Sequence, residues 1–392
     1  MDKKIYLDNA ATTKTRPEVV EAMIPYFTEL YGNPSSIYEF AAQNKKVVDD
    51  ARSIIAKSLG AESAEIYFTA GGTESDNWAL KAAVDAYSGK GNHIITSKIE
   101  HHAILHTCEY LEKHGFEVTY VDVDEFGILK MDQLKKAIRP TTVLISIMFA
   151  NNEIGTLQPI KEIGEIAKQN NILFHTDAVQ AFGQLPIDVN DLNIDMLSAS
   201  GHKLNGPKGI GFLYIRKGVK IRSFVHGGGQ ERQRRAGTEN VPGIVGLGKA
   251  VEIAVETMKE RSEKEIALRD FLMKRVLSEV PFVRVNGHKT RRLPNNVNIS
   301  FQFIEGESLL IMLDMNNICA SSGSACTSGS LDPSHVLLAI GLPHEIAHGS
   351  LRLTLSHETT EDEINYTVDR IKEIVEKLRT MSPLYEDFMK KR

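Results

Sequence analysis

Lys203 is the residue of this chain whose surroundings best suit covalent chemistry. It lies in Ser200-Gly201-His202-Lys203, directly after the strand-like run Met196–Ala199. An amine fixed between glycines at the end of a strand can lose enough hydration to stay nucleophilic, and it can then form a Schiff base with an aldehyde. Taken alone, Lys203 would be interpreted as a surface lysine in a Gly/Pro turn, so the interpretation depends on the residues around it.

Asp177 provides a carboxylate at the end of another apolar strand. It closes His175-Thr176-Asp177 and precedes Lys203 by 203 − 177 = 26 residues. A carboxylate under a pyridine nitrogen keeps that nitrogen protonated, so the ring can act as an electron sink, as pyridoxal phosphate sites require. Asp is also a preferred helix N-cap. Because Lys203 accompanies it, we favour the role beside a pyridine ring.

The turn at Gly71-Gly72-Thr73 can cradle a phosphate. It follows the apolar strand Ile66–Phe68 and opens an amphipathic helix, so free N–H groups and the helix dipole would face an anion. Thr73 to Asp76 also matches a weak capping-box pattern, which would serve the helix alone. The turn therefore supports a phosphate site only in combination with Lys203 and Asp177.

Two histidines, His101 and His102, begin another helix after a strand-like run. One of these imidazoles could stack on a flat ring and move protons near neutral pH. Adjacent histidines project in different directions and no third ligand accompanies them, so we expect no metal site.

Cys326 is the candidate sulfur nucleophile. It lies in Ala320–Ser330, whose small residues cannot pack tightly against a core, so we expect a mobile surface loop that presents one thiol. Such a thiol becomes a nucleophile where a nearby cation or ligand stabilises its thiolate. An accidental loop cysteine is the alternative. Cys108 and Cys319 are expected to be small buried hydrophobes, and three cysteines form neither a disulfide framework nor metal-type spacing.

Alternating strands and helices must position these residues. Between about residues 65 and 215, short apolar runs alternate with amphipathic stretches, which predicts an α/β fold with a mostly parallel sheet and helices on both faces. Such sheets bind ligands beyond the carboxyl ends of their strands, where Asp177 and Lys203 fall. The predicted strands are Ile66–Phe68, His93–Ile95, Val118–Val121, Val143–Ile147, Ile172–Phe174, Met196–Ser198 and Ile210–Ile215.

A long connecting helix and a smaller α+β unit should follow the sheet. We expect the helix from about Val241 to Glu279. In the smaller unit we expect strands at Asn295–Phe301 and Ser350–Leu355, and helices at Glu307–Asp314, Pro333–Ile340 and Thr360–Met381.

The composition is that of an ordinary globular protein, with 42% hydrophobic and 25% charged residues over 392 positions. A net charge of −5 provides no broad basic field for nucleic acid. The N-terminus becomes polar before a signal-peptide core could form, and no apolar run approaches membrane-spanning length. We therefore expect a cytoplasmic protein that contacts neither a membrane nor nucleic acid directly.

Taken together, these segments resemble the NifS/IscS-like cysteine desulfurases of the aspartate-aminotransferase fold type. The resemblance covers nearly the whole chain and is highly specific in its order and spacing. It implies fold type I of the pyridoxal-phosphate-dependent transferases, with a seven-stranded sheet in a large domain (residues 16–261) and a small α+β domain (residues 1–15 and 262–392) that carries the cysteine loop. The motifs are Tyr6–Thr13, Gly32–Ser36, Gly72–Ser75, Asn151–Gly155, Ser200–Lys203, Gly227–Thr238 and Ser321–Ser328.

The resemblance also implies roles in the conversion of L-cysteine to L-alanine, with the sulfur left on Cys326 as a persulfide. Lys203 would bind pyridoxal phosphate, Asp177 would pair with its pyridine nitrogen and His101 would stack on its ring. Arg352, whose guanidinium fork suits a carboxylate, would hold the substrate with help from Asn33. Further cofactor contacts would come from Gly72, Thr73, Asn152, Gln180, Ser200 and His202, and from Thr238 across a homodimer interface.

The persulfide would pass to a sulfur-acceptor protein that serves iron–sulfur cluster assembly or tRNA thiolation. Two alternatives stay open at this point. An aminotransferase or selenocysteine lyase of the same fold would keep Lys203 and Asp177 but need no cysteine nucleophile, and a non-catalytic scaffold would keep the fold alone. A dinucleotide-binding protein is less favoured, because no G-x-G-x-x-G run follows the first strand of the α/β region.

Overall fold

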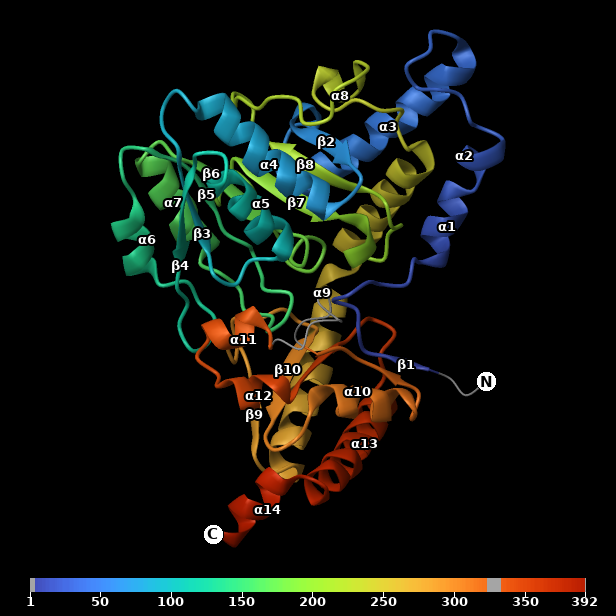
Figure 1. The fold of residues 1–392 in the computed structure, drawn as a ribbon. Helices are drawn as coiled ribbons and strands as arrows, with labels where there is room; N and C mark the ends of the chain where they lie inside the picture. The colour runs from blue at the N-terminus through green and yellow to red at the C-terminus, as the bar shows by residue number, and fades with distance from the viewer. Residues whose placement is uncertain (1–3, 323–332, 392) are drawn as a thin grey trace.

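The seven predicted strands form one mixed sheet in the computed structural model, which describes residues 4–322 and 333–391 (Figure 1). The strand order is β2-β8-β7-β6-β5-β3-β4, and all neighbours are parallel except β8, which runs antiparallel to β2 and β7. The predicted α/β fold is therefore confirmed. The strands are β2 (Ile66–Thr69), β3 (His93–Ser97), β4 (Glu117–Val121), β5 (Thr142–Ser146), β6 (Leu173–Asp177), β7 (Met196–Ser200) and β8 (Gly211–Ile215).

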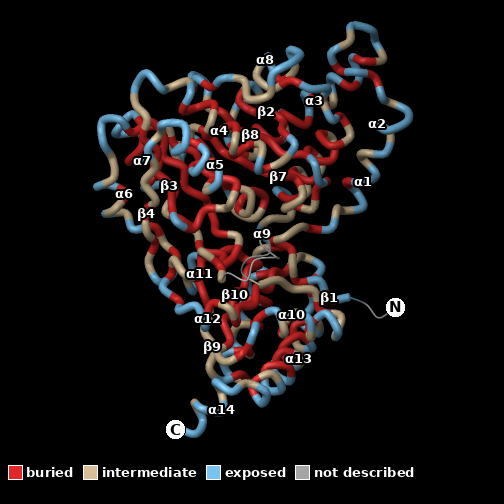
Figure 2. Tube along the Cα trace, viewed as in Figure 1, coloured by how far each residue is buried: buried red, intermediate tan, exposed pale blue. Residues whose placement is uncertain are grey.

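Helices cover both faces of this sheet because its strands are apolar on both sides. Ile94 and Leu144 pack in the cluster that includes helices α4 and α5, whereas the next residues, Ile95 and Ile145, pack in the cluster that includes α3, α7 and α9. Consecutive strand residues thus bury opposite faces, as the two-residue period requires; Figure 2 shows the strands as the buried centre. The helices before α9 are α1 (Pro17–Met23), α2 (Pro25–Thr28), α3 (Glu39–Ser58), α4 (Gly72–Tyr87), α5 (His102–Glu112), α6 (Met131–Ala137), α7 (Ile160–Gln169) and α8 (Gln230–Gln233).

The long helix α9 (Val241–Glu279) has the bounds predicted from the sequence and joins two lobes (Figure 1). Its first half packs in the core of the large lobe, and its second half packs in the core of the small lobe. The domain boundaries at residues 15 and 261 stay a prediction. The small lobe contains the antiparallel sheet β12-β10-β9 and the parallel pair β1-β11. Its elements are β1 (Ile5–Tyr6), β9 (Val283–Val285), β10 (Asn296–Phe301), β11 (Ile318–Cys319), β12 (Ser350–Thr354), α10 (Gly306–Asp314), α11 (His335–Ala339), α12 (His344–His348), α13 (Glu361–Thr380) and α14 (Pro383–Lys390).

The sequence analysis did not predict α1 to α3, α8, α12, β1 and β9, nor the C-terminal helix α14. Its Tyr385 and Phe388 pack on Phe282 and Phe303, with ring centroids 4.9 to 6.3 Å apart. Contacts with residues about a hundred positions away stabilise this short segment, and local patterning does not reveal them. Within the described ranges, no helix combines the length and apolar character that a bilayer span requires.

Candidate active site

Lys203 lies in a short 3-10 turn, Gly201–Lys203, at the carboxyl end of β7. Its Nζ donates hydrogen bonds to the carbonyl oxygens of Ala10 (2.5 Å) and Ala11 (2.7 Å). After Lys203 the chain returns close to Gly201, so close that a Cβ on Gly206 would lie 2.8 Å from the carbonyl oxygen of Gly201. The amine is thus held at the sheet edge by backbone acceptors from the N-terminal segment.

Asp177 ends β6, the strand next to β7, and is 6% exposed. Its Oδ1 accepts a hydrogen bond from the backbone N–H of Val179 (2.9 Å), so the carboxylate closes a turn. Burial raises the pKa of Asp177 to about 6, and the charge of Lys203 opposes this rise. The two residues therefore act on one another within a single site.

His101 caps helix α5, and its Nδ1 accepts a hydrogen bond from the backbone N–H of Ala103 (3.1 Å). Burial lowers the pKa of His101 to about 4, and the neighbouring charge of Lys203 contributes to the shift. The imidazole is therefore neutral near pH 7, with Nε2 as the protonated nitrogen in the tautomer that this hydrogen bond requires. A neutral flat ring suits stacking on an aromatic cofactor.

The first turn of α4 begins with two glycines that lie close to Val179 and Ser200. Gly72 is buried, and a Cβ there would come within 2.5 Å of Val179 Cγ2. Gly71 is the N-cap and no side chain caps the helix, so the capping-box alternative for Thr73 to Asp76 is wrong. Ser200 is buried at the end of β7 beside Gly71, while Thr73 is exposed. The uncapped N-terminus of this sixteen-residue helix therefore lies beside the Ser200 hydroxyl, and these glycines, helix N–H groups and hydroxyl form a cradle of the kind that can bind a phosphate.

His202 and Gln180 connect this edge of the sheet to the N-terminal segment. His202 Nδ1 contacts Thr12 Oγ1 (3.1 Å), and Gln180 Nε2 donates to the carbonyl of Ala10 (3.0 Å), which also accepts from Lys203. Burial lowers the pKa of His202 to about 4, so its imidazole is neutral near pH 7. Together with the α4 cradle, the Asp177 carboxylate and the Lys203 amine, these groups fit pyridoxal phosphate.

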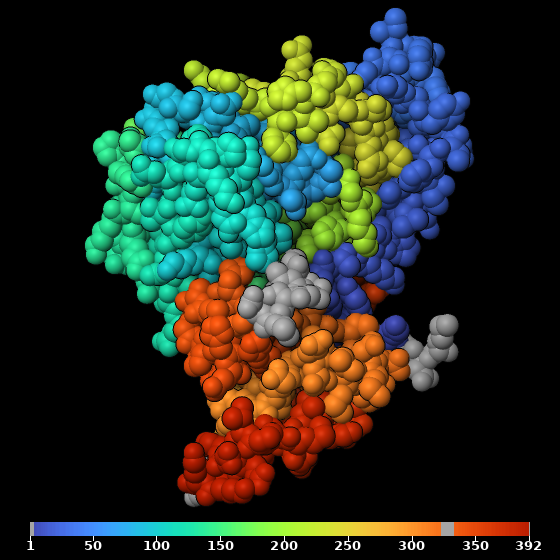
Figure 3. Space-filling view, in the orientation of Figure 1, coloured from blue at the N-terminus to red at the C-terminus, as the bar shows by residue number. Residues whose placement is uncertain are grey.

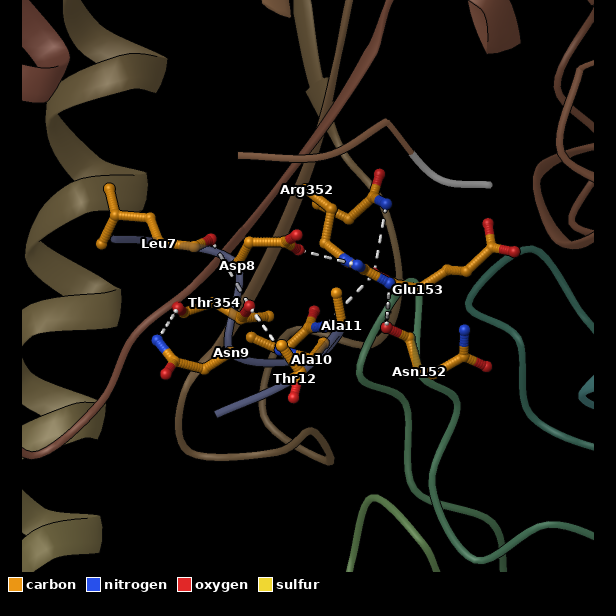
Figure 4. Close-up of polar contacts among 12 residues, drawn as sticks. Leu7, Asp8, Asn9, Ala10, Ala11, Thr12, Asn152, Glu153, Arg352 and Thr354 are labelled. Atoms are coloured by element: carbon orange, nitrogen blue, oxygen red, sulfur yellow. Dashed lines mark hydrogen bonds and ion pairs between the residues drawn. The ribbon is translucent and has the colours of Figure 1, made fainter. Parts of the chain in front are cut away.

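Arg352, on β12, reaches this region from the small lobe. Its side chain is 2% exposed, and its guanidinium lies between the carboxylate of Asp8, with Nη2 to Oδ1 at 2.9 Å, and the carbonyl oxygen of Asn152, with Nη1 to O at 3.1 Å (Figure 4). The backbone of Arg352 also exchanges hydrogen bonds with Ser321. The guanidinium is therefore buried beside both the N-terminal turn and the Asn152 turn.

Two predicted site residues, Asn33 and Thr238, do not join this group within the chain. Asn33 is exposed, and its Oδ1 accepts a hydrogen bond from the backbone N–H of Ser35 (2.9 Å). Thr238 is exposed at a cavity of about 240 Å³ that Thr69, Glu231 and Arg235 also line. Both side chains are therefore exposed at the surface of the chain.

The three cysteines have different placements. Cys108 is buried, as predicted, whereas Cys319 is half-buried in β11 rather than fully buried, because β11 is a two-residue strand at the edge of the small lobe. Cys326 lies outside the described residues, and so does most of the predicted loop Ala320–Ser330.

Sequence reasoning missed a buried polar group beneath Asp177. His175 contacts the hydroxyls of Ser146 and Ser198 at 2.9 Å each, and its Nε2 lies 3.8 Å from Asp76 Oδ1. Burial raises the pKa of Asp76 well above its usual range, and the nearby Asp177 adds to that rise. The available signal was the two-residue spacing of His175 and Asp177, which places both side chains on one face of β6.

The chain is similar to known proteins over nearly its full length. Residues 5–367 match the family model described as Aminotransferase class-V. A cysteine desulfurase IscS of Clostridium botulinum is 59% identical over 392 residues, covering 100% of this chain and 99% of that protein. An IscS of Methanosarcina thermophila is 61% identical over 383 residues, covering 98% and 95% of the two chains.

Solved structures agree with this relationship. A NifS-like protein superposes with a TM-score of 0.91 at 41% identity, covering 96% of this chain and 100% of the other. SspA in complex with cysteine superposes with a TM-score of 0.82 at 40% identity, covering 91% and 100%. The chain therefore belongs to the aminotransferase class-V family and, within it, to the IscS/NifS-like cysteine desulfurases.

Proposed function

We propose that this protein removes sulfur from L-cysteine with pyridoxal phosphate bound through Lys203, and that Cys326 receives the sulfur as a persulfide. The observation that carries the proposal is that Asp177 and Lys203 lie at the carboxyl ends of the adjacent strands β6 and β7, and that the charge of Lys203 acts on both Asp177 and His101, which follows β3. The names of the full-length relatives and the cysteine complex of SspA support the choice of substrate.

Each residue of this group has one task. Pyridoxal phosphate, when bound, supplies an electron sink for an amino acid joined to its aldehyde. The Asp177 carboxylate keeps the pyridine nitrogen protonated, and a positive nitrogen beside it would favour the ionised carboxylate further. The neutral ring of His101 would stack on the bound cofactor. Lys203 Nζ would take the α-proton of cysteine, and the carbonyls of Ala10 and Ala11 would keep the amine in place.

Sulfur leaves by attack of the Cys326 thiolate on the sulfur atom of the substrate. The carbon–sulfur bond of cysteine breaks, a sulfur–sulfur bond forms on Cys326, and the carbon takes up a proton to give L-alanine, so the step needs no external oxidant. Arg352 binds the substrate carboxylate. The residues that flank the Cys326 segment support this arrangement, since Ser321 pairs with the Arg352 backbone and Ser334 donates a hydrogen bond to Glu153, next to Asn152.

Mass analysis after incubation with cysteine tests the proposal. We expect alanine as product and a sulfur adduct on Cys326, and we expect borohydride to trap a pyridoxyl group on Lys203. Cys326→Ala should keep the yellow cofactor but release no sulfide, whereas the matched control Cys319→Ala should retain activity. Undiminished sulfide release by Cys326→Ala would identify a lyase without an enzyme persulfide, and a colourless protein without a Lys203 adduct would identify a scaffold.

We also propose that the protein is a homodimer whose interface includes the α1–α2 arm. Large apolar side chains on this arm and the segment after it are exposed, namely Val20, Ile24, Phe27, Tyr31 and Ile37. The arm forms a flank of the large lobe (Figure 3), and several large exposed apolar side chains on one arm favour a protein partner. The exposed Asn33 and Thr238 would then contact the site of the partner subunit. Sedimentation should show a dimer that Phe27→Lys weakens, and a monomeric wild type would contradict the proposal.

The sulfur acceptor follows from the persulfide chemistry. We propose a protein thiol acceptor in the cytoplasm, such as an iron–sulfur scaffold or a carrier for tRNA thiolation. Transfer of labelled sulfur from cysteine to a purified scaffold protein, with Cys326→Ala as the inactive control, would identify it.

A further inference from the structure

The Arg352 guanidinium is already bound to a carboxylate of the chain itself. Figure 4 shows Asp8 at one end of the guanidinium and the Asn152 carbonyl at the other, at 2.9 and 3.1 Å. A cation with 2% side-chain exposure requires a counter-charge, because an unpaired buried charge is costly. The ion pair with Asp8 supplies that counter-charge.

Glu153, the other buried carboxyl near Arg352, does not take this role. Its Oε2 accepts a hydrogen bond from the hydroxyl of Ser334, and burial raises its pKa to about 7, so the carboxyl is only partly ionised at neutral pH. Asp8 is 17% exposed at its side chain, whereas Arg352 is held on both sides. Of the two partners, Asp8 is therefore the one with room to turn toward solvent.

The backbone of the turn that contains Asp8 also contacts Lys203. The carbonyl of Asp8 accepts hydrogen bonds from the N–H groups of Ala11 and Thr12, which fixes the turn. The carbonyls of Ala10 and Ala11 in the same turn hold the Lys203 amine. The turn thus presents a carboxylate to Arg352, the proposed ligand of the substrate carboxylate, and acceptors to Lys203, the proposed cofactor-bearing amine that the substrate amine displaces.

We infer that Asp8 is a specificity-determining residue whose carboxylate holds Arg352 until the carboxylate of the substrate replaces it. Binding is then an exchange of one carboxylate for another, and it leaves the buried guanidinium paired throughout. A thiol or amine that lacks a carboxylate cannot displace Asp8 and gains nothing from Arg352. The inference rests on the proposed role of Arg352 as the carboxylate ligand of cysteine.

Steady-state kinetics of the holoenzyme test this exchange with two thiol inhibitors. 3-Mercaptopropionate carries the carboxylate without the amine, and cysteamine carries the amine without the carboxylate. Because Asn is a weaker competitor for Arg352, Asp8→Asn should lower KM for cysteine and the inhibition constant of 3-mercaptopropionate by roughly tenfold, the equivalent of one charge-assisted hydrogen bond. The inhibition constant of cysteamine should not change. An unchanged or raised KM overturns the inference.

A control variant and Arg352→Lys separate the possible failures. Asp191→Asn breaks an exposed ion pair of the same 2.9 Å length, to Lys161, and should leave all constants unchanged. If Arg352→Lys does not weaken 3-mercaptopropionate, the proposed role of Arg352 is wrong. If it does, but Asp8→Asn does not tighten the inhibitor, only the exchange is wrong.

Crystal structures of the wild-type holoenzyme with and without 3-mercaptopropionate decide the question if Asp8→Asn does not fold. We expect the inhibitor carboxylate on Arg352 and the Asp8 side chain turned away. An Asp8–Arg352 contact that persists beside the bound inhibitor carboxylate overturns the inference.

Discussion

Replacing Glu231 with Gln should destabilise the protein and loosen the segment that leads to Thr238. Glu231 binds Arg52 through two contacts of 2.8 Å, and its Oε2 accepts a hydrogen bond from the backbone N–H of Phe68 at 2.9 Å. The side chains of Arg52 and Glu231 are 8% and 4% exposed. The pair therefore anchors the segment after Gly227 to strand β2.

The size of the loss in the free energy of unfolding depends on which interactions Arg52 would keep. Breaking a buried pair by removing one charge costs about 3–5 kcal/mol. Arg52 would keep its hydrogen bond to the carbonyl of Ile66 (2.7 Å) and its position over the Phe68 ring (4.6 Å), so we expect about 3 kcal/mol. The anchor also matters locally, because Glu231, Arg232 and Gln233 have φ values of 45°, 57° and 66°. Non-glycine residues in this region cost roughly 1 kcal/mol each, so the segment needs the ion pair to hold its shape.

Urea unfolding of a double-mutant cycle measures the effect. Arg52→Met and Glu231→Gln should each lower the free energy of unfolding, whereas the double variant leaves no buried charge and still offers Phe68 an acceptor. We expect the double variant to be more stable than the sum of the single losses by about 2 kcal/mol. The exposed pair variant Asp191→Asn should unfold like the wild type. A coupling energy below about 0.5 kcal/mol, the range of independent sites, would refute the reasoning.

Three further predictions test other parts of the structure. Burial raises the pKa of Glu100 from 4.5 to about 8, so the folded protein binds this proton more tightly than the unfolded chain. The contribution of Glu100 to the free energy of unfolding is then complete below pH 4.5 and is lost as pH rises from 4.5 to 8. Within that window the loss is about 1.4 kcal/mol per pH unit. In Glu100→Gln, which cannot ionise, the urea midpoint should decline less over the same pH range. Asp177→Asn should raise the dissociation constant for pyridoxal phosphate roughly tenfold in equilibrium dialysis, because the pyridine nitrogen loses its charged partner, and unchanged binding would contradict its role. Thr360→Ala should cost about 1 kcal/mol in urea unfolding, because Thr360 and Glu363 form a reciprocal cap on α13, with hydrogen bonds of 3.0 and 3.2 Å; an unchanged midpoint would show that the cap is dispensable.

The fold could be predicted where local patterning and tertiary packing agree. Runs such as Ile94–Ile95 are apolar at consecutive positions, and only a strand covered on both faces buries both side chains. Helix α9 could be bounded because Asn240 caps its start and Pro281 follows its end. The strand order and the antiparallel direction of β8 depend on pairings between distant segments, which periodicity does not encode.

The candidate site was predictable to the extent that it follows the edge of the sheet. Asp177 and Lys203 could be paired because the carboxyl ends of parallel strands meet at one edge. The Asp8–Arg352 pair could not, because 344 residues separate its members and each alone has an ordinary surface interpretation. The exposure of Thr238 could not be predicted from its neighbours in the sequence either, because it depends on how distant segments pack around it.

The N-terminal turn explains how a site shared by two lobes keeps its dimensions. Lys203 and Gln180 belong to the large lobe, while Arg352 belongs to β12 in the small lobe. Residues 8–12 contact all three, through the Asp8 carboxylate and the Ala10 and Ala11 carbonyls. Backbone hydrogen bonds tie the ends of this segment to both lobes: Leu7 and Asn9 bond to Cys319 and Thr354 of the small lobe, and Thr13 bonds to His202 of the large lobe. Because the turn is hydrogen-bonded to both lobes, a shift of one lobe against the other must strain it before the distance between the Lys203 amine and the Arg352 guanidinium can change. Under the proposed roles of these two residues, the turn therefore sets the separation between the amine that carries the cofactor and the guanidinium that binds the substrate carboxylate.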